Sequence, residues 1–228
     1  MGVMRKRIKP IVVYVVLALL GLALVIANIH NTSKQQAHLQ NVKSAIPYAT
    51  TPKTTTSSTS SSSDEELILN PIIDLSGWQL PQDIDYDVLS NHISGAIVRV
   101  FGGSQISKDS NAASSNGIDK SFKTHIKELK KRDVPVAVYS YAQGTSVKEM
   151  KEEARIFYKN ASPYKPTYYW IDVEEETMSN MEQGVQAFLA ELKRLGAEKV
   201  GLYIGAYFML EQEVSTKNFD AVWIPAYG

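Results

Sequence analysis

The stretch Tyr168-Tyr169-Trp170-Ile171-Asp172-Val173-Glu174-Glu175-Glu176 is an aromatic, β-prone run that ends in acidic residues. A β-strand places residues i and i+2 on one face, so Asp172 and Glu174 are expected to point together at the C-terminal end of a strand. Adjacent carboxylates repel, and burial beside Trp170 adds a desolvation cost, so one member of the pair can hold a proton near neutral pH. Such a pair suits general acid catalysis on a glycosidic bond. A solvated strand end that leads into a helix N-terminus is the other interpretation.

The charge of the 228-residue chain is divided between two different segments. Seven Lys and Arg residues and no acidic residue precede Asp64, so residues 1–63 carry a formal charge of +7 and the remainder −7. An acidic globular part argues against nucleic acid as a partner, because neutralising phosphates requires a basic face. The chain contains no cysteine, which excludes disulfides and thiol chemistry.

The N-terminal segment has the pattern of a membrane anchor. Four basic residues between positions 5 and 9 precede an uncharged apolar run from Ile11 to Ala27. At about 1.5 Å per residue this run is about 25 Å long, enough for a thin or locally adapted bilayer. We therefore predict a cytoplasmic basic segment at 1–10, a transmembrane signal-anchor at 11–29, and the rest of the chain outside the cell membrane at the cell wall. A cleaved signal peptide is the alternative, and both predict export.

Residues 30–66 are predicted to be a disordered linker. They include an unbroken Ser/Thr tract at 54–63. Such a composition buries too little apolar surface to offset the entropy lost on ordering. The segment is expected to act as a flexible tether that gives a surface-held domain its reach.

From residue 67 onward, strand-like apolar runs alternate with helical patterns. The expected strands cover 67–69 with 72–75, 96–101, 134–139, 168–174, 200–204 and 221–224, and the expected helices cover 86–92, 120–132, 147–158, 181–195 and a short piece from about 206. This alternation predicts a mainly parallel sheet covered by helices, in an α/β fold of the irregular TIM-like (β/α) barrel type. In that architecture, functional residues lie at the C-terminal ends of the strands. The following fall at or near such ends and are expected to share one cleft: Asp74, Gly102, Tyr139, Asp172, Glu174, Tyr203 and Trp223 to Tyr227.

Several of these motifs together resemble one known family. Asp74-Leu75-Ser76-Gly77-Trp78-Gln79 is similar to the Asp-x-Ser-x-aromatic-Gln opening of family 25 glycoside hydrolases, the muramidase or lysozyme family. Trp170-Ile171-Asp172-Val173-Glu174 resembles the Asp-x-Glu strand of that family, and Trp223-Ile224-Pro225-Ala226-Tyr227 resembles one of its late strands. The resemblance covers about residues 67–228. The family continues past this last strand to a further aspartate, so we expect a cleft that is incomplete in a chain ending at Gly228.

The resemblance implies an activity and a role for each residue. The activity is hydrolysis of the β-1,4 bond between N-acetylmuramic acid and N-acetylglucosamine in peptidoglycan, in cell-wall remodelling and without a cofactor. Glu174 would be the general acid, Asp172 would stabilise the oxocarbenium charge or orient the acetamido group, and Asp74 would be the third carboxylate. The aromatic residues at strand ends suit stacking on sugar faces or packing in the core, and they are Tyr139, Tyr203, Trp223 and Tyr227.

Two other classes of protein were weighed against this one. A metal-dependent deacetylase would need a His/Asp cluster. His30 and His38 lie in the tether region, and His92 and His125 are expected on helix surfaces, so no metal site is predicted. The non-enzyme alternative is a catalytically inactive, surface-anchored domain that binds glycan or acts as a wall-assembly scaffold. The presence of all three carboxylates favours the enzyme.

Overall fold

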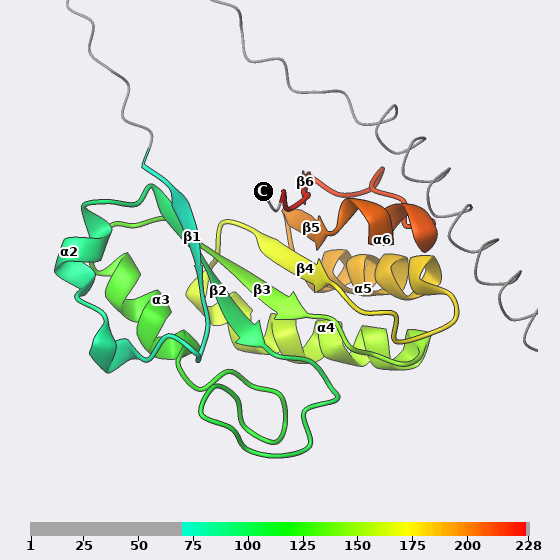
Figure 1. The fold of residues 1–228 in the computed structure, drawn as a ribbon, viewed down its shortest axis with the longest axis horizontal. Coiled ribbons are helices and arrows are strands. Elements are labelled where there is room, and N and C mark those ends of the chain that lie inside the picture. The colour runs from blue at the N-terminus through cyan, green and yellow to red at the C-terminus, as the bar shows by residue number, and fades with distance from the viewer. Residues whose placement is uncertain (1–69, 227–228) are drawn as a thin grey trace, which may run out of the picture. The chain divides into compact units, whose positions relative to one another are not determined.

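Six parallel strands form the sheet of this protein, and helices pack against its outer face (Figure 1). The computed structural model describes residues 70–226. The strands follow one another in the sheet in their order along the chain, and each is parallel to its neighbours. They are β1 (Ile72–Leu75), β2 (Gly95–Phe101), β3 (Val136–Tyr141), β4 (Tyr169–Val173), β5 (Val200–Ile204) and β6 (Ala221–Trp223). All six C-terminal ends therefore lie along one edge.

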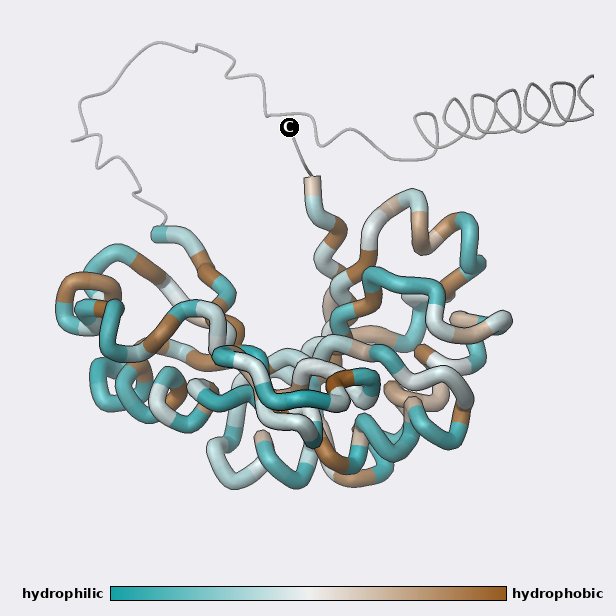
Figure 2. The backbone as a smooth tube through the Cα atoms, turned by 60° about the horizontal axis from the view of Figure 1, so that its bottom comes forward, coloured by the Kyte–Doolittle hydropathy of each residue, from teal (hydrophilic) through white to brown (hydrophobic). Residues whose placement is uncertain are grey.

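The sheet is curled into a half-barrel, with β1 and β6 as its two edge strands among the described residues. Figure 2 shows the described chain bent into an arc around a concave side. The prediction of a parallel α/β fold is confirmed. An irregular TIM-like barrel was predicted, and residues 70–226 form an open half-barrel of six parallel strands.

The helices begin and end where local capping signals place them. They are α2 (Tyr86–Ser90), α3 (Phe122–Lys130), α4 (Val147–Ala161), α5 (Met181–Leu195) and α6 (Ala206–Glu211), with 3-10 turns at η1 (Pro81–Asp83) and η2 (Ser162–Tyr164). The side chain of Asn180 accepts a hydrogen bond from the Gln183 amide and begins α5. Gly196, with a φ of 106°, ends it in the left-handed conformation that glycine adopts without strain. The predicted bounds of α5 and β5 are confirmed residue for residue, and the other elements shift by a few residues.

The core lies between the outer face of the sheet and helices α4 and α5. Ile171 and Val173 of β4 are fully buried there. Phe157 of α4 packs edge-to-face on Tyr169, with ring centroids 5.8 Å apart, and contacts Phe188 of α5 at 6.5 Å. Burial of each such side chain stabilises the fold by about 1.5–3 kcal/mol. Because the alternate residues of β4 are committed to this core, the residues between them must face the concave side.

Some predictions fall outside the described residues. These are the cytoplasmic segment at 1–10, the signal-anchor at 11–29, the linker at 30–66, the strand-like run at 67–69 and the aromatic residue Tyr227. In the part of the chain from 70 to 226, no helix is long and apolar enough to cross a membrane.

Trp170 depends on a glycine in the neighbouring strand. Trp170 and Gly201 are in register across β4 and β5, and a Cβ added at Gly201 would lie 2.5 Å from Cε3 of the indole. We expect Gly201→Ala to displace the ring, destabilise the protein by about 1–3 kcal/mol and change tryptophan fluorescence, as measured by denaturant unfolding. The matched control is Gly95→Ala in β2, where the nearest atom would be 3.4 Å from the added Cβ. Equal effects of the two substitutions would contradict this account.

Candidate active site

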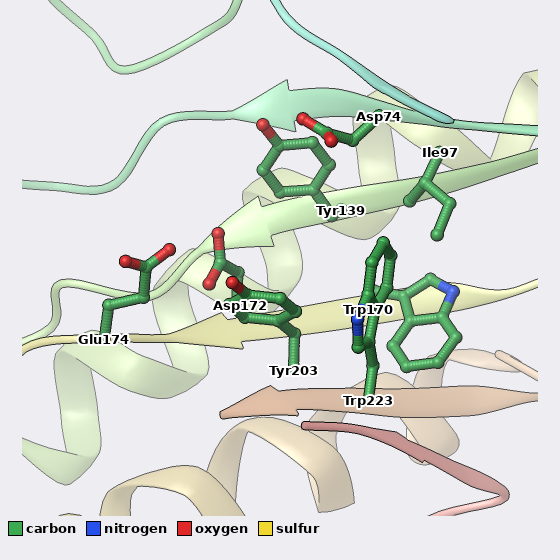
Figure 3. A pocket seen from close by; sticks show the side chains of 8 residues that line it. All are labelled: Asp74, Ile97, Tyr139, Trp170, Asp172, Glu174, Tyr203 and Trp223. Carbon is green, nitrogen blue, oxygen red and sulfur yellow. The ribbon is translucent and has the colours of Figure 1, made fainter. Parts of the chain in front are cut away.

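A pocket of about 180 Å³ opens on the concave face of the half-barrel. The side chains that line it come from all six strands and from the residue that follows β4, and they are Asp74, Ile97, Tyr139, Trp170, Asp172, Glu174, Tyr203 and Trp223 (Figure 3). The structure therefore brings together all three predicted carboxylates and three of the four predicted aromatic residues. Trp170 joins them, although the sequence analysis used it only as a neighbour of the acids.

Strand register explains why these side chains meet. Asp172 is in register with Tyr203 of β5, and Tyr203 is in register with Trp223 of β6. In-register residues of a parallel sheet point to the same face. Glu174 lies two residues beyond Asp172 and faces the same pocket, as the period of two predicts. Figure 3 shows the Tyr139 hydroxyl and the Asp74 carboxyl group pointing toward one another on the far side of the same space.

The carboxyl group of Asp172 is the buried member of the acidic set. Asp172 is only 9% exposed, whereas Asp74 and Glu174 are exposed to solvent. Burial raises the pKa of Asp172 to about 8, and the negative charge of Glu174, a hydrogen bond with that side chain and the charge of Asp74 act in the same direction. Arg99 opposes them. The Asp172 carboxyl group therefore keeps its proton to a higher pH than an ordinary aspartate does.

One oxygen of this carboxyl group has no protein partner. Asp172 Oδ1 is buried and accepts no hydrogen bond from the described residues. Most buried polar atoms in proteins are paired, and leaving one unpaired costs stability. Asp172 lines the pocket as a residue, but this oxygen itself is closed off from solvent.

Aromatic rings form one wall of the pocket. Trp223 packs edge-to-face against Tyr203, with centroids 5.4 Å apart, and against Trp170 at 6.2 Å. Tyr168 stacks on Trp170 at 5.8 Å. Trp223 remains 37% exposed. This wall therefore presents large apolar faces, fixed by their mutual contacts, beside the carboxylates.

Arg99 and Asp119 support the site, and neither was predicted from the sequence. Arg99 of β2 is in register with Tyr139, and its Nε donates a 2.9 Å hydrogen bond to Asp119. Asp119 is buried and also accepts from the amides of Gly77 at 2.7 Å and Ser121 at 2.8 Å. It belongs to the long loop after β2, whose Ser- and Asn-rich sequence hid its role. No local pattern in the sequence could have paired these residues.

His125 corrects one sequence prediction. It was expected on a helix surface, but it is fully buried. Its Nδ1 lies 2.6 Å from the Tyr86 hydroxyl and its Nε2 lies 3.1 Å from the carbonyl oxygen of Ser76. Burial lowers its pKa. The histidine therefore supports the turn that follows Asp74. His92 is exposed, as predicted.

The fold and site together define a class: a parallel half-barrel whose concave pocket holds three carboxyl groups and an aromatic wall. A family model, Glycosyl hydrolases family 25, matches residues 73–228. The chain belongs to this family. None of the curated proteins compared with the chain gave a match.

Solved structures agree with this assignment. GHIP, a glycosyl hydrolase 25 and virulence factor of Streptococcus pneumoniae participating in host cell invasion, is 57% identical over 70% of this chain and 69% of its own, with a TM-score of 0.68. The catalytic domain of endolysin ply40 from bacteriophage P40 of Listeria monocytogenes is 25% identical over 69% of this chain and 73% of its own, with a TM-score of 0.59. The modular Cpl-1 endolysin, solved with a peptidoglycan analogue, shares the fold at 17% identity and a TM-score of 0.53, over 69% and 44% of the two chains.

Asp172 should make the stability of the protein depend on pH in an unusual direction. A carboxyl group whose pKa rises from 3.8 to about 8 on folding stabilises the fold below pH 4, and this contribution is lost as the pH rises toward 8. We expect Asp172→Asn to remove the loss and to raise the free energy of unfolding at pH 8, but not at pH 4. The gain arises because the folded state opposes ionisation of the Asp172 carboxyl group, and asparagine has no charge to bury. Denaturant unfolding at both pH values measures it.

The control is Asp87→Asn at the protein surface. The pKa of Asp87 is lowered by its hydrogen bond with Arg132, so its contribution is present above the unfolded pKa and lost as the pH falls. Asp87→Asn should therefore bring no gain at pH 8. If Asp172→Asn behaved in the same way as Asp87→Asn, the buried and protonated state of Asp172 would be wrong.

Proposed function

We propose that the protein is a peptidoglycan hydrolase that cleaves the β-1,4 bond between N-acetylmuramic acid and N-acetylglucosamine. The observation that supports this function best is that Asp74, Asp172 and Glu174 line one pocket on the concave face. Membership of glycosyl hydrolases family 25 supports the same reaction class. A relative of the same fold was solved with a peptidoglycan analogue, which agrees with a glycan strand as substrate.

Glu174 is proposed as the general acid that protonates the leaving oxygen. It is exposed at the open side of the pocket and shares a hydrogen bond with the protonated Asp172. A proton passed from Asp172 to Glu174 through this bond would protonate Glu174 for its role as general acid and leave Asp172 as a carboxylate. That carboxylate would then face the positive charge that develops on the sugar ring, or orient the acetamido group of the substrate.

The aromatic wall is proposed to hold the glycan strand. Trp170, Tyr203 and Trp223 are fixed against one another by edge-to-face contacts, so they offer sugar faces a surface that loses little entropy on binding. Tyr139 lies opposite them, beside Asp74 (Figure 3). A sugar ring bound between the two sides would place its glycosidic oxygen near the carboxylate pair.

We further propose that the enzyme acts at the outer surface of its own cell membrane, held by residues 11–29 and extended by the linker at 30–66. The apolar run with its basic flank supports this location. Confinement at the membrane would keep wall cleavage local, because the tether fixes the effective concentration of the enzyme.

Membrane anchoring predicts how the chain fractionates. The full-length protein should sediment with membranes and stay there through an alkaline wash, and external protease should remove residues 64–228 from intact cells without their wall. Replacing Leu17 and Leu20 with Arg should release the protein from membranes, because each charge in the span costs about 2.5–3.5 kcal/mol. A soluble wild-type protein that starts after residue 27 would show instead that the segment is a cleaved signal peptide.

The acid role of Glu174 predicts a large loss of activity without a loss of fold. With purified peptidoglycan, the full-length protein should lower turbidity and release new reducing ends at N-acetylmuramic acid. Glu174→Gln should reduce that rate by about 10²–10⁴-fold, which is the usual contribution of general acid catalysis. The thermal midpoint of the variant should remain close to that of the wild type, since Glu174 is exposed.

Glu176→Gln is the matched control, because Glu176 is exposed in the same acidic run and bonds to Gln212 outside the pocket. It should keep wild-type activity. Equal activity in Glu174→Gln and the wild type would remove Glu174 from the acid role. Peptidoglycan binding without cleavage by the wild type would favour the glycan-binding or scaffold alternative.

A further inference from the structure

Arg99 places a positive charge on the concave face, next to the proposed catalytic residues. Its strand neighbour in register is Tyr139, whose own neighbour in register is Trp170, and both of these line the pocket. The Arg99 side chain is 13% exposed, so solvent screens its charge weakly. The guanidinium group acts electrostatically on both Tyr139 and Asp172.

Asp119 fixes this arginine in place. The carboxylate is fully buried, at 0% side-chain exposure, and lies 2.9 Å from Arg99 Nε. Two amides also donate to it, from Gly77 at 2.7 Å and from Ser121 at 2.8 Å, so its oxygens are satisfied in the interior. Gly77 follows Asp74 by three residues, and Ser121 is the N-cap residue of α3. One carboxylate thus joins the arginine of β2 to the turn that follows Asp74, the third acid of the site.

The charges around the acidic pair explain what this arginine does. The titratable or charged groups that face Asp172 and Glu174 from the surrounding elements are Asp74 of β1, Arg99 of β2, Tyr139 and Tyr141 of β3, Glu175 after β4, Tyr203 of β5 and, behind Arg99, Asp119. Arg99 is the positive charge in this set. Without it, only negative or neutral groups would surround a pair that must release and regain a proton in each turnover.

We propose that Arg99 is a positioning residue of the active site, which sets the ionisation of the Asp172–Glu174 pair through its positive charge, and that Asp119 holds it for that purpose. The first test rests on the proposed function, because it reads ionisation from the pH dependence of peptidoglycan cleavage. Arg99→Gln removes the positive charge. The alkaline limb of the kcat/KM profile should move to higher pH by about one unit, the lower end of the shift that an opposite charge produces at short range.

Two further substitutions test the direction in which the alkaline limb moves, which a general disturbance of the fold would not reproduce. Arg99→Lys keeps the charge and should leave the limb within about 0.3 pH units of the wild type. Asp119→Asn removes the negative charge behind Arg99, so its limb should move to lower pH. Arg155→Gln, which breaks a comparable ion pair with Glu191 in α4 and α5 on the outer face, should leave the profile in place. If Arg99→Gln does not fold, the comparison of Arg99→Lys with Asp119→Asn decides the question.

A profile that keeps its position in Arg99→Gln while activity falls equally at every pH would overturn the proposal and leave Arg99 a structural residue. So would shifts of the same sign in Arg99→Gln and Asp119→Asn. A titration of the ¹³C-labelled carboxyl group of Asp172 by NMR gives the same comparison without any catalysis. If the wild type cleaves no peptidoglycan, the proposed function fails, while an upward shift of this titration in Arg99→Gln still supports the charge-setting role and an unchanged midpoint rejects it.

Discussion

The alternation of side chains along β4 is the constraint on which the rest of the structure depends. Tyr169, Ile171 and Val173 face α4 and α5, and the residues between them face the pocket. A register slip of one residue would place Asp172 under the helices and expose Ile171 and Val173, losing apolar burial and stranding a carboxyl group in the core. The core therefore fixes the direction of the acids as firmly as it fixes the fold.

The loop between β2 and α3 extends this control to the other side of the pocket. A Cβ at Gly77 would meet the carbonyl oxygen of Ala112 at 2.1 Å, so only glycine lets this loop approach the turn after β1. The same glycine donates its amide to Asp119. The end of β1 is thus held from the loop side by a carboxylate and from the helix side by His125, which contacts the carbonyl oxygen of Ser76. Asp74 lies on a strand end whose backbone is fixed on both sides.

The parts that could be predicted from the sequence are those with local causes. A cap at Asn180 and a left-handed glycine at position 196 determine α5, and both signals lie directly beside the helix that they delimit. The pairing of Asp172 with Glu174 follows from the period of a strand. Arg99 and Asp119 lie 20 residues apart, and Asp119 and Gly77 lie 42 apart, so their contacts arise only when the strands assemble.

The burial of His125 also could not be predicted from the local sequence. A histidine in an amphipathic helix is usually taken as exposed, because burial requires partners for both ring nitrogens. Here those partners are the Tyr86 hydroxyl and a backbone carbonyl from the turn after β1, neither of which is near it in the sequence. The burial of that polar group was a property of the tertiary structure.

Three of the four buried carboxyl groups in the described residues, those of Asp119, Glu153 and Asp172, show how the chain treats negative charge away from the helix surface. Asp119 accepts from two amides and Arg99, and Glu153 of α4 accepts from the amides of Ser104 and Gln143. Asp172, which lines the pocket, keeps one buried oxygen without a hydrogen-bond partner among the described residues. The fold thus supplies hydrogen-bond donors to the buried carboxylates of Asp119 and Glu153, and both residues stabilise loops. The third is left without that stabilisation, which agrees with the raised pKa of Asp172.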